Sequence, residues 1–297
     1  TAAYRHDVAE FIATAKGVSY VQPIHLLFVT SASETPLSSH PRCLVVAERD
    51  SECLVIEDYV SIDDGVYFTN PVTEIVLEDN ARVRHVKLQR ESHKAFHIAT
   101  AAVSLGRNAH YSGNNISLGA RISRNDLRVL QIAEGAECTL DGLTLIGGRQ
   151  LADTHTIIDH AKAHGMSRQL NKCIVDGSAH AVFNGKILVR KDAQQTDSAQ
   201  SSRNLLLSGK AHIDTKPQLE IFADDVKCAH GATVGQLDMD EVFYLKSRGL
   251  DESAARSLLI YAFAAEIIAK IPLASVKKQL ERVVMEQMHI ESIGGGL

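Results

Sequence analysis

The stretch Asp176–Ala179 reads Asp-Gly-Ser-Ala, and three others share its chemistry of small or acidic residues before an Ala: Glu78–Ala81, Glu134–Ala136 and Ser208–Ala211. Gly, Asn and Asp adopt the left-handed or bent conformations that turn a strand sharply, and the Ala that follows is small enough to point inward. Because one corner chemistry recurs, the sequence indicates a repeated unit. Corners at irregular multiples of a short period are typical of a β-solenoid, in which each coil buries its face against the next.

Between residues 21 and 237, these corners separate short runs of Val, Ile, Leu and Thr with almost no helical period. Such runs predict a region dominated by strands. The chain has no Trp and only 5% aromatic residues, which favours stacked strands with small layered side chains. An antiparallel β-sandwich or jelly roll remains the alternative, and its Asn-Gly hairpin signal occurs once, at Asn184-Gly185. The runs include Cys43–Val46, Cys53–Ile56, Val72–Leu77, Ala81–Leu88, Phe96–Val103, Leu127–Ile132, Leu143–Ile146, Thr156–Ile158, Lys172–Val175, Lys186–Val189 and Leu205–Leu207.

The end of the chain changes to helical character. Asp238 and Glu241 form a capping-box pattern, Gly249 is placed to end the first helix, and Asp251 is placed to begin the second. The third helix has a single apolar stripe and is amphipathic. We predict helices at Met239–Arg248, Glu252–Lys270 and Ser275–Met288.

The chain therefore divides into three predicted regions. Residues 1–20 are expected to be the remnant of an N-terminal helical region, with a short helix at Tyr4–Ala15. Residues 21–237 form the β core, and residues 238–297 form a C-terminal helical domain.

Charge and composition exclude several classes of function. The 31 Lys and Arg against 36 Asp and Glu give a net charge of −5, so we expect neither nucleic-acid nor membrane binding. The most apolar stretch, Leu258–Ala265, is far shorter than the ~20 residues of a membrane span. The five cysteines are odd in number and lack a Cys-x-x-Cys pair, which predicts reduced thiols. We expect a cytoplasmic protein, or one of the plastid stroma if a transit peptide has been removed.

Motifs for common enzymes are missing from the sequence. The segment Asn184–Ile187 lacks the Ser or Thr and the upstream Gly of a Walker A loop, so we interpret it as an ordinary turn. There is no Gly-x-Ser-x-Gly elbow and no His-Glu-x-x-His helix. On a helix, His160 and His164 would share a face and could hold a metal with Asp159 or His155, but the surroundings predict a strand, so we interpret these histidines as surface imidazoles. The sequence therefore lacks the standard hydrolase signatures.

One pair of residues suggests metal chemistry. If the stretch Val226–His230 is extended, alternation puts Cys228 and His230 on one face, with the points where their side chains leave the backbone about 7 Å apart. A thiolate and an imidazole are a soft ligand set for iron, zinc or copper. Two ligands do not close a metal site, so further ligands have to come from elsewhere, including another subunit.

These residues lie in segments that resemble a known family, the SUF iron–sulfur cluster assembly proteins of the SufB/SufD type. The resemblance runs from about Pro23 to the end of the chain, and it is most specific between Asp176 and Gly249. The segments that carry it are Phe183–Ile187, Thr196-Asp197, Arg203–Ser208, Asp214–Ile221, Ala223–Gly235 and Phe243–Gly249.

The resemblance implies a right-handed parallel β-helix with a C-terminal helical domain, which favours the solenoid over the sandwich. It implies a scaffold subunit without ATPase activity, working with a SufB-like paralogue and a SufC-like ABC ATPase. A transient iron–sulfur cluster is expected at the interface with SufB, with His230 and Cys228 as candidate ligands, and none is expected in the isolated chain. The SufC-docking surface maps to the segment from Asp238 to Ile271, for which we select Tyr244, Arg248 and Arg256.

Two other classes of function compete with this interpretation. β-Solenoids also host polysaccharide-active enzymes, although free thiols and few aromatic residues for sugar stacking count against one here. The other alternative is a structural homodimer, because an open solenoid edge invites strand pairing with a second copy.

Overall fold

The computed structural model describes residues 9–31 and 37–287. The strands are β1 Ala9–Thr14, β2 Ile24–Thr30, β3 Leu37–Ser39, β4 Arg42–Ala47, β5 Glu52–Ser61, β6 Tyr67–Thr69, β7 Val72–Leu77, β8 Arg82–Arg90, β9 Phe96–Leu105, β10 His110–Ser117, β11 Ile122–Gln131, β12 Glu137–Ile146, β13 Leu151–His160, β14 Met166–Val175, β15 His180–Val189, β16 Thr196–Leu206, β17 His212–Ile221 and β18 Val226–Gly235. The helices are α1 Met239–Ser247, α2 Glu252–Ile268 and α3 Ala274–Gln287.

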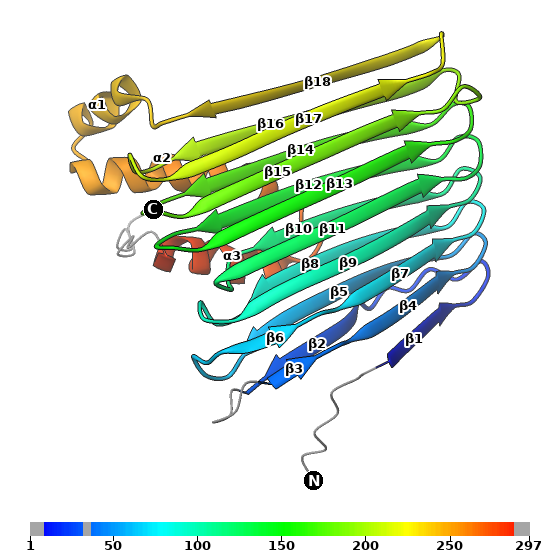
Figure 1. The fold of residues 1–297 in the computed structure, drawn as a ribbon, viewed down its shortest axis with the longest axis horizontal. Coiled ribbons are helices and arrows are strands. Elements are labelled where there is room, and N and C mark those ends of the chain that lie inside the picture. The colour runs from blue at the N-terminus through cyan, green and yellow to red at the C-terminus, as the bar shows by residue number, and fades with distance from the viewer. Residues whose placement is uncertain (1–8, 32–36, 288–297) are drawn as a thin grey trace.

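The strands form a β-solenoid of two facing parallel sheets, with successive coils stacked in chain order from β1 to β18 (Figure 1). The first sheet, called here the odd sheet, runs β1-β4-β7-β9-β11-β13-β15-β17, with β3 and β6 beside it. The second, the even sheet, runs β18-β16-β14-β12-β10-β8-β5-β2. Every strand pair between described residues is parallel, for example β14 with β16 and β15 with β17. The predicted solenoid is therefore confirmed, and the antiparallel sandwich is excluded.

Three of the four predicted corners turn through a left-handed residue. Asn80, Gly135 and Gly177 have φ values of 60°, 69° and 64°. The corners also stack by backbone hydrogen bonds: the Asn80 amide donates to the Arg107 carbonyl of the next coil, at 2.8 Å. The backbone therefore bends where Asn or Gly tolerates a positive φ.

Two local predictions are wrong. Asn184-Gly185 is not a turn but lies in the middle of β15, because parallel neighbours on both sides fix the backbone of that strand. The residues Ala9–Thr14, expected to be helical, form β1 and pair in parallel with β4, which supplies hydrogen-bond partners to the whole segment. Residues 1–8 of the predicted N-terminal helix lie outside the described part of the chain, as does Met288 of the third predicted helix.

The helices follow the predicted boundaries within two residues. The side chain of Asp238 accepts a hydrogen bond from the Asp240 amide at the start of α1, and Asp251 accepts one from Ala254 in α2. Both are N-caps, which satisfy amides that have no partner within the helix. Gly249 follows α1 with φ of 97°, as a helix-ending glycine does.

The helices α2 and α3 cover part of the outward face of the even sheet. Their apolar side chains, including Ile267 and Leu280, join one buried cluster with outward-facing strand residues such as Ile116 and Leu143. No helix among the described residues is long and apolar enough to cross a membrane.

Polar contacts reinforce this packing. The Lys172 ammonium, on the outward face of β14, donates to the Phe263 carbonyl of α2 at 2.8 Å and pairs with Glu266 at 2.5 Å. Lys270 donates to Asp141 of β12 at 2.6 Å. These contacts fix how the C-terminal helices lie on the solenoid.

We expect Ile267→Ala to lower the free energy of unfolding by about 2–5 kcal/mol, because Ile267 is 0% exposed at the helix–sheet contact and its truncation leaves a cavity. Ile62→Ala is the matched control: Ile62 is 74% exposed, so its effect should stay within ~0.5 kcal/mol. Urea unfolding of both variants measures the difference. Equal stabilities would contradict the packing of α2 on the even sheet.

Candidate functional site

Cys228 and His230 lie on β18, the terminal strand of the even sheet. The strand is extended, as predicted, and pairs in parallel with β16, with Cys228 opposite Ser198 and His230 opposite Gln200. Ser198 and Gln200 are buried in the interior of the solenoid, at 2% exposure each. The alternation therefore directs Cys228 and His230 along the inward-facing rows of the solenoid, at its open end.

Cys228 is half-buried. It packs against a small cluster of buried apolar side chains that includes Ile187 and Val189. Burial raises the pKa of the Cys228 thiol, and the Asp197 carboxylate raises it further, while a hydrogen bond with the Ser198 backbone opposes the shift. Because the thiolate is the form that binds metals, any metal ion that binds Cys228 has to displace the thiol proton.

His230 is exposed at the end of a row of hydrogen-bonded polar side chains. Below it, the Gln200 amide donates to Gln169 at 2.7 Å, and the Gln169 amide donates to Thr156 of the odd sheet at 2.9 Å. The Oε1 atom of Gln200 is buried and has no hydrogen-bond partner within the described structure. The imidazole of His230 thus extends a polar interior row to the surface.

Two donors, one soft and one intermediate, suit iron but do not complete a coordination shell. β18 has a neighbour on one side only, so the described strands leave the other side of these donors free. Ligands from a second chain at this edge would complete the site.

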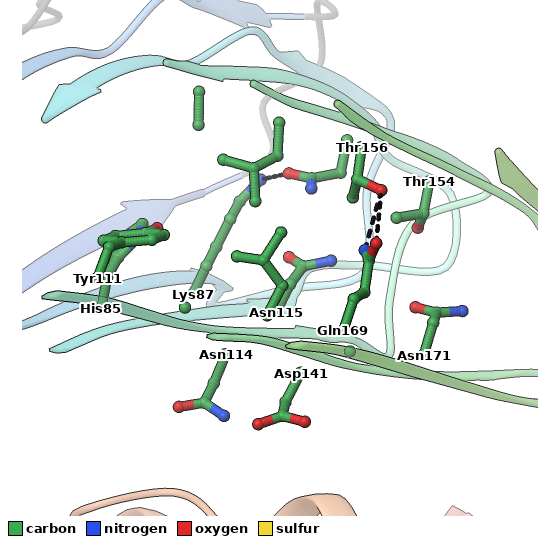
Figure 2. Close-up of a pocket in the computed structure, with 16 residues that line it drawn as sticks. His85, Lys87, Tyr111, Asn114, Asn115, Asp141, Thr154, Thr156, Gln169 and Asn171 are labelled. Carbon is green, nitrogen blue, oxygen red and sulfur yellow. Dashed lines mark hydrogen bonds between the residues drawn. The ribbon is translucent and has the colours of Figure 1, made fainter. Parts of the chain in front are cut away.

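Deeper in the solenoid, the same rows line a cavity of about 40 Å³. Figure 2 shows Lys87 and Gln169 reaching from the even sheet toward the opposite strands, where Gln169 meets Thr156. The Lys87 ammonium donates to Asn125 of β11 at 2.8 Å. The cavity is large enough for water, which needs ~10–15 Å³ and polar partners.

A buried charged cluster lies beside this cavity. Glu57 contacts His85 at 3.2 Å and accepts a hydrogen bond from Tyr59 at 2.9 Å, and it is the register partner of Lys87. Burial alone raises the pKa of Glu57, but His85, Lys87 and a hydrogen bond with Thr73 outweigh it and lower the pKa to about 2. Burial lowers the pKa of Lys87 to about 8, against the opposing effect of Glu57. At neutral pH, both groups are therefore charged, and Glu57 and Glu91 both favour the charged form of Lys87.

The predicted docking residues lie on the first two helices. Tyr244 on α1 and Arg248, the residue that caps the end of this helix, are both exposed, with the guanidinium 3.3 Å from the phenol oxygen and 5.2 Å from the ring centre. Arg256 is half-exposed on α2. Sequence reasoning missed Phe243 and Met239, which are 72% and 56% exposed and make the surface of α1 apolar. The signal was present, because Phe243 begins one of the segments that carry the family resemblance.

The other predicted histidine group does not come together. The strand interpretation is confirmed, because His155 and His160 lie on β13 with opposite burial. His160 is fully buried and contacts Ser167 at 2.9 Å, so it is not a surface imidazole, and His164 occupies a corner with φ of 61°.

Known proteins are similar to this chain in sequence. A model of the family described as "SUF system FeS cluster assembly, SufBD core domain" matches residues 28–263. The chain belongs to the SufBD family. This membership confirms the resemblance found in the sequence and places the chain in the SUF system of iron–sulfur cluster assembly.

Relatives of this family are similar over most of the chain. An iron–sulfur cluster assembly SufBD family protein of Synechocystis is 48% identical over 270 residues, which are 88% of this chain and 60% of that protein. The chloroplastic protein ABCI7 of Arabidopsis thaliana is 37% identical, over 89% of this chain and 57% of its own length. The iron–sulfur cluster assembly protein SufD of Escherichia coli is 36% identical, over 91% of this chain and 64% of its own length. The chain thus spans 57–64% of the length of these relatives.

We expect Glu57→Gln to destabilise the SufBD core by about 3–5 kcal/mol at pH 7, because it removes the buried carboxylate that contacts His85 and one of the two carboxylates that favour the charged form of the buried Lys87. The folded pKa of about 2 lies below the ordinary 4.5, so the stabilisation is complete above pH 4.5 and is lost as the pH falls toward 2. The difference between the two proteins should therefore shrink between pH 5 and pH 3. Urea unfolding across this range tests it, with the exposed Glu74→Gln as control.

We expect Cys228 to be alkylated first among the five cysteines, because the other four are buried. Its raised pKa predicts slow reaction with iodoacetamide at pH 7 and a rate that increases above pH 9. Peptide mass spectrometry of the native protein measures both. Faster labelling of Cys138, or full labelling of Cys228 at pH 7, would contradict the described burial.

Proposed function

We propose that this SufBD chain is a scaffold subunit without ATPase activity in a SufBCD complex, where it pairs with a SufB-like paralogue and docks a SufC-like ABC ATPase. The complex builds an iron–sulfur cluster and passes it to acceptor proteins. The observation that carries the proposal is the placement of Cys228 and His230 on one face of an edge strand with a single neighbour. The relative from Escherichia coli named SufD supports it.

The partner of β18 completes the ligand set. An edge strand presents unpaired backbone groups, which another strand recognises by continuing the sheet. A paralogue with the same solenoid would bring its own terminal coil against β18, and its thiolates would lie beside Cys228 and His230. The nascent cluster is cargo that is held only while both chains are assembled.

His230 is the better ligand of the two. It is exposed, and imidazole is the commonest metal ligand among protein side chains. Cys228 has a raised pKa and is half-buried, so it joins the cluster only when a metal displaces its proton.

The ATPase docks on the helical domain. Met239, Phe243 and Tyr244 form an exposed apolar surface on α1, with Arg248 beside Tyr244. Exposed aromatic and arginine side chains are enriched in the centres of protein interfaces. Arg256, on α2, contributes at the edge of this surface.

The same open edge supports a homodimer when the chain is alone, because a second copy of β18 satisfies the same backbone groups. Size-exclusion chromatography of the chain, alone and with SufB-like and SufC-like partners, separates these states. We infer that the protein works in the cytoplasm or the plastid stroma, since its relatives include bacterial proteins and a chloroplastic one.

We expect His230→Ala to reduce the cluster absorption of the co-expressed three-subunit complex at least about tenfold after anaerobic reconstitution with iron and sulfide. Cys228→Ser should have a smaller effect, because its thiol is partly held in the core. The matched control is His25→Ala, an exposed histidine on β2, the opposite terminal strand of the even sheet.

Visible absorption measures the cluster, and size-exclusion chromatography shows that the complex remains intact. An unchanged cluster band in an intact His230→Ala complex would contradict the role of this chain as a ligand donor. The cluster would then be held by the partner alone.

A further inference from the structure

A second group of metal-ligating side chains lies on the outer face of the odd sheet. His180 begins β15 and His212 begins β17, and the two residues are direct register partners in the parallel pair. Asp214 follows two residues after His212, so alternation places its side chain on the same outward face. One turn of the solenoid thus brings together residues that are 32 positions apart in the sequence.

The side chains converge. The Nε2 atom of His180 lies 2.8 Å from one Asp214 oxygen, and the Nε2 atom of His212 lies 3.3 Å from the other. The two imidazole rings are 4.8 Å apart, centre to centre, with an edge of one toward the face of the other. One donor atom from each residue fits within 4.8 Å of the others.

These separations suit one metal ion. Imidazole nitrogen and carboxylate oxygen bind Zn²⁺ at ~2.0–2.2 Å, which puts neighbouring donors of one ion roughly 3 Å apart. His212 and Asp214 are exposed and His180 is half-exposed, so rotation of these side chains can bring the donors closer to that spacing. Two imidazoles and a carboxylate are also the donor set of non-haem iron(II) sites.

From this geometry we propose that His180, His212 and Asp214 bind one divalent first-row transition-metal ion on the outer face of the last two strands of the odd sheet. The proposal is independent of the cluster role of Cys228 and His230. Three protein ligands leave further coordination positions open to water or to a ligand from another molecule. β17 is the edge strand, so the described structure leaves the approach from that side free.

Other exposed histidine–carboxylate contacts in the described structure hold a single imidazole each. His110 contacts Glu137 at 2.9 Å on the even sheet, and His155 contacts Asp153 at 2.9 Å on the odd sheet. Among described residues, the group at His180 is the one in which three potential ligands converge. His110 therefore provides a matched control for an exposed histidine with an acidic neighbour.

The test is Zn²⁺ binding by isothermal titration calorimetry on the untagged 297-residue chain carrying Cys228→Ser and His230→Ala, which removes the proposed cluster ligands. We expect one equivalent of Zn²⁺ to bind. His212→Ala and Asp214→Asn should each weaken binding at least about tenfold, since losing even an outer partner of a metal ligand costs that much. His110→Ala should bind Zn²⁺ as the parent chain does.

Two further measurements separate binding from folding. Circular dichroism shows whether each variant keeps its strands, and thermal unfolding shows whether Zn²⁺ raises the melting temperature of the parent but not of His212→Ala. Co²⁺ in place of Zn²⁺ should give a visible absorption band that Asp214→Asn removes. Folded His212→Ala and Asp214→Asn chains that bind Zn²⁺ as tightly as the parent would overturn the proposal, as would no binding by the parent.

Discussion

Parallel backbone pairing between successive coils is the constraint on which the rest of this structure depends. Each strand satisfies its amides and carbonyls through the coil before it and the coil after it, as β16 does between β14 and β18. The last coil has no described successor, so β17 and β18 keep one free edge each. An inward-facing row that would be buried in the middle of the solenoid becomes accessible there. This is why Cys228 and His230 point along the interior and still reach the surface.

The same stacking explains the unusual interior. Rows of side chains run through the coils at fixed register, so one polar residue is placed directly above another. The Gln200–Gln169 hydrogen bond and the register of Lys87 opposite Glu57 follow from this stacking. Apolar residues on the outward face of the even sheet, such as Ile116 and Leu143, are covered by α2 and α3. The helices α2 and α3 therefore serve as the outer layer of the core, while α1 keeps large apolar side chains exposed.

Sequence reasoning succeeded where the chemistry is local. Asn and Gly at the corners, the caps Asp238 and Asp251, and the alternation around Cys228 depend on neighbours within a few residues. It was wrong at Asn184-Gly185, because a dipeptide that favours a tight turn is overridden when parallel strands pair with it on both sides. It was wrong at Ala9–Thr14 for the same reason, since pairing with β4 decides the conformation of that segment.

The sequence by itself determined the strand-rich body, the helical end, the family and the Cys228–His230 pair, because each can be recognised from residues that are close together in the sequence. The tertiary structure alone decided which distant residues meet. His180 and His212 face each other because the coils between them have the length that puts both in one register, and no local pattern encodes that length. It also decided that β18 is the last strand and that Phe243 stays exposed, because exposure depends on what lies opposite a residue in space.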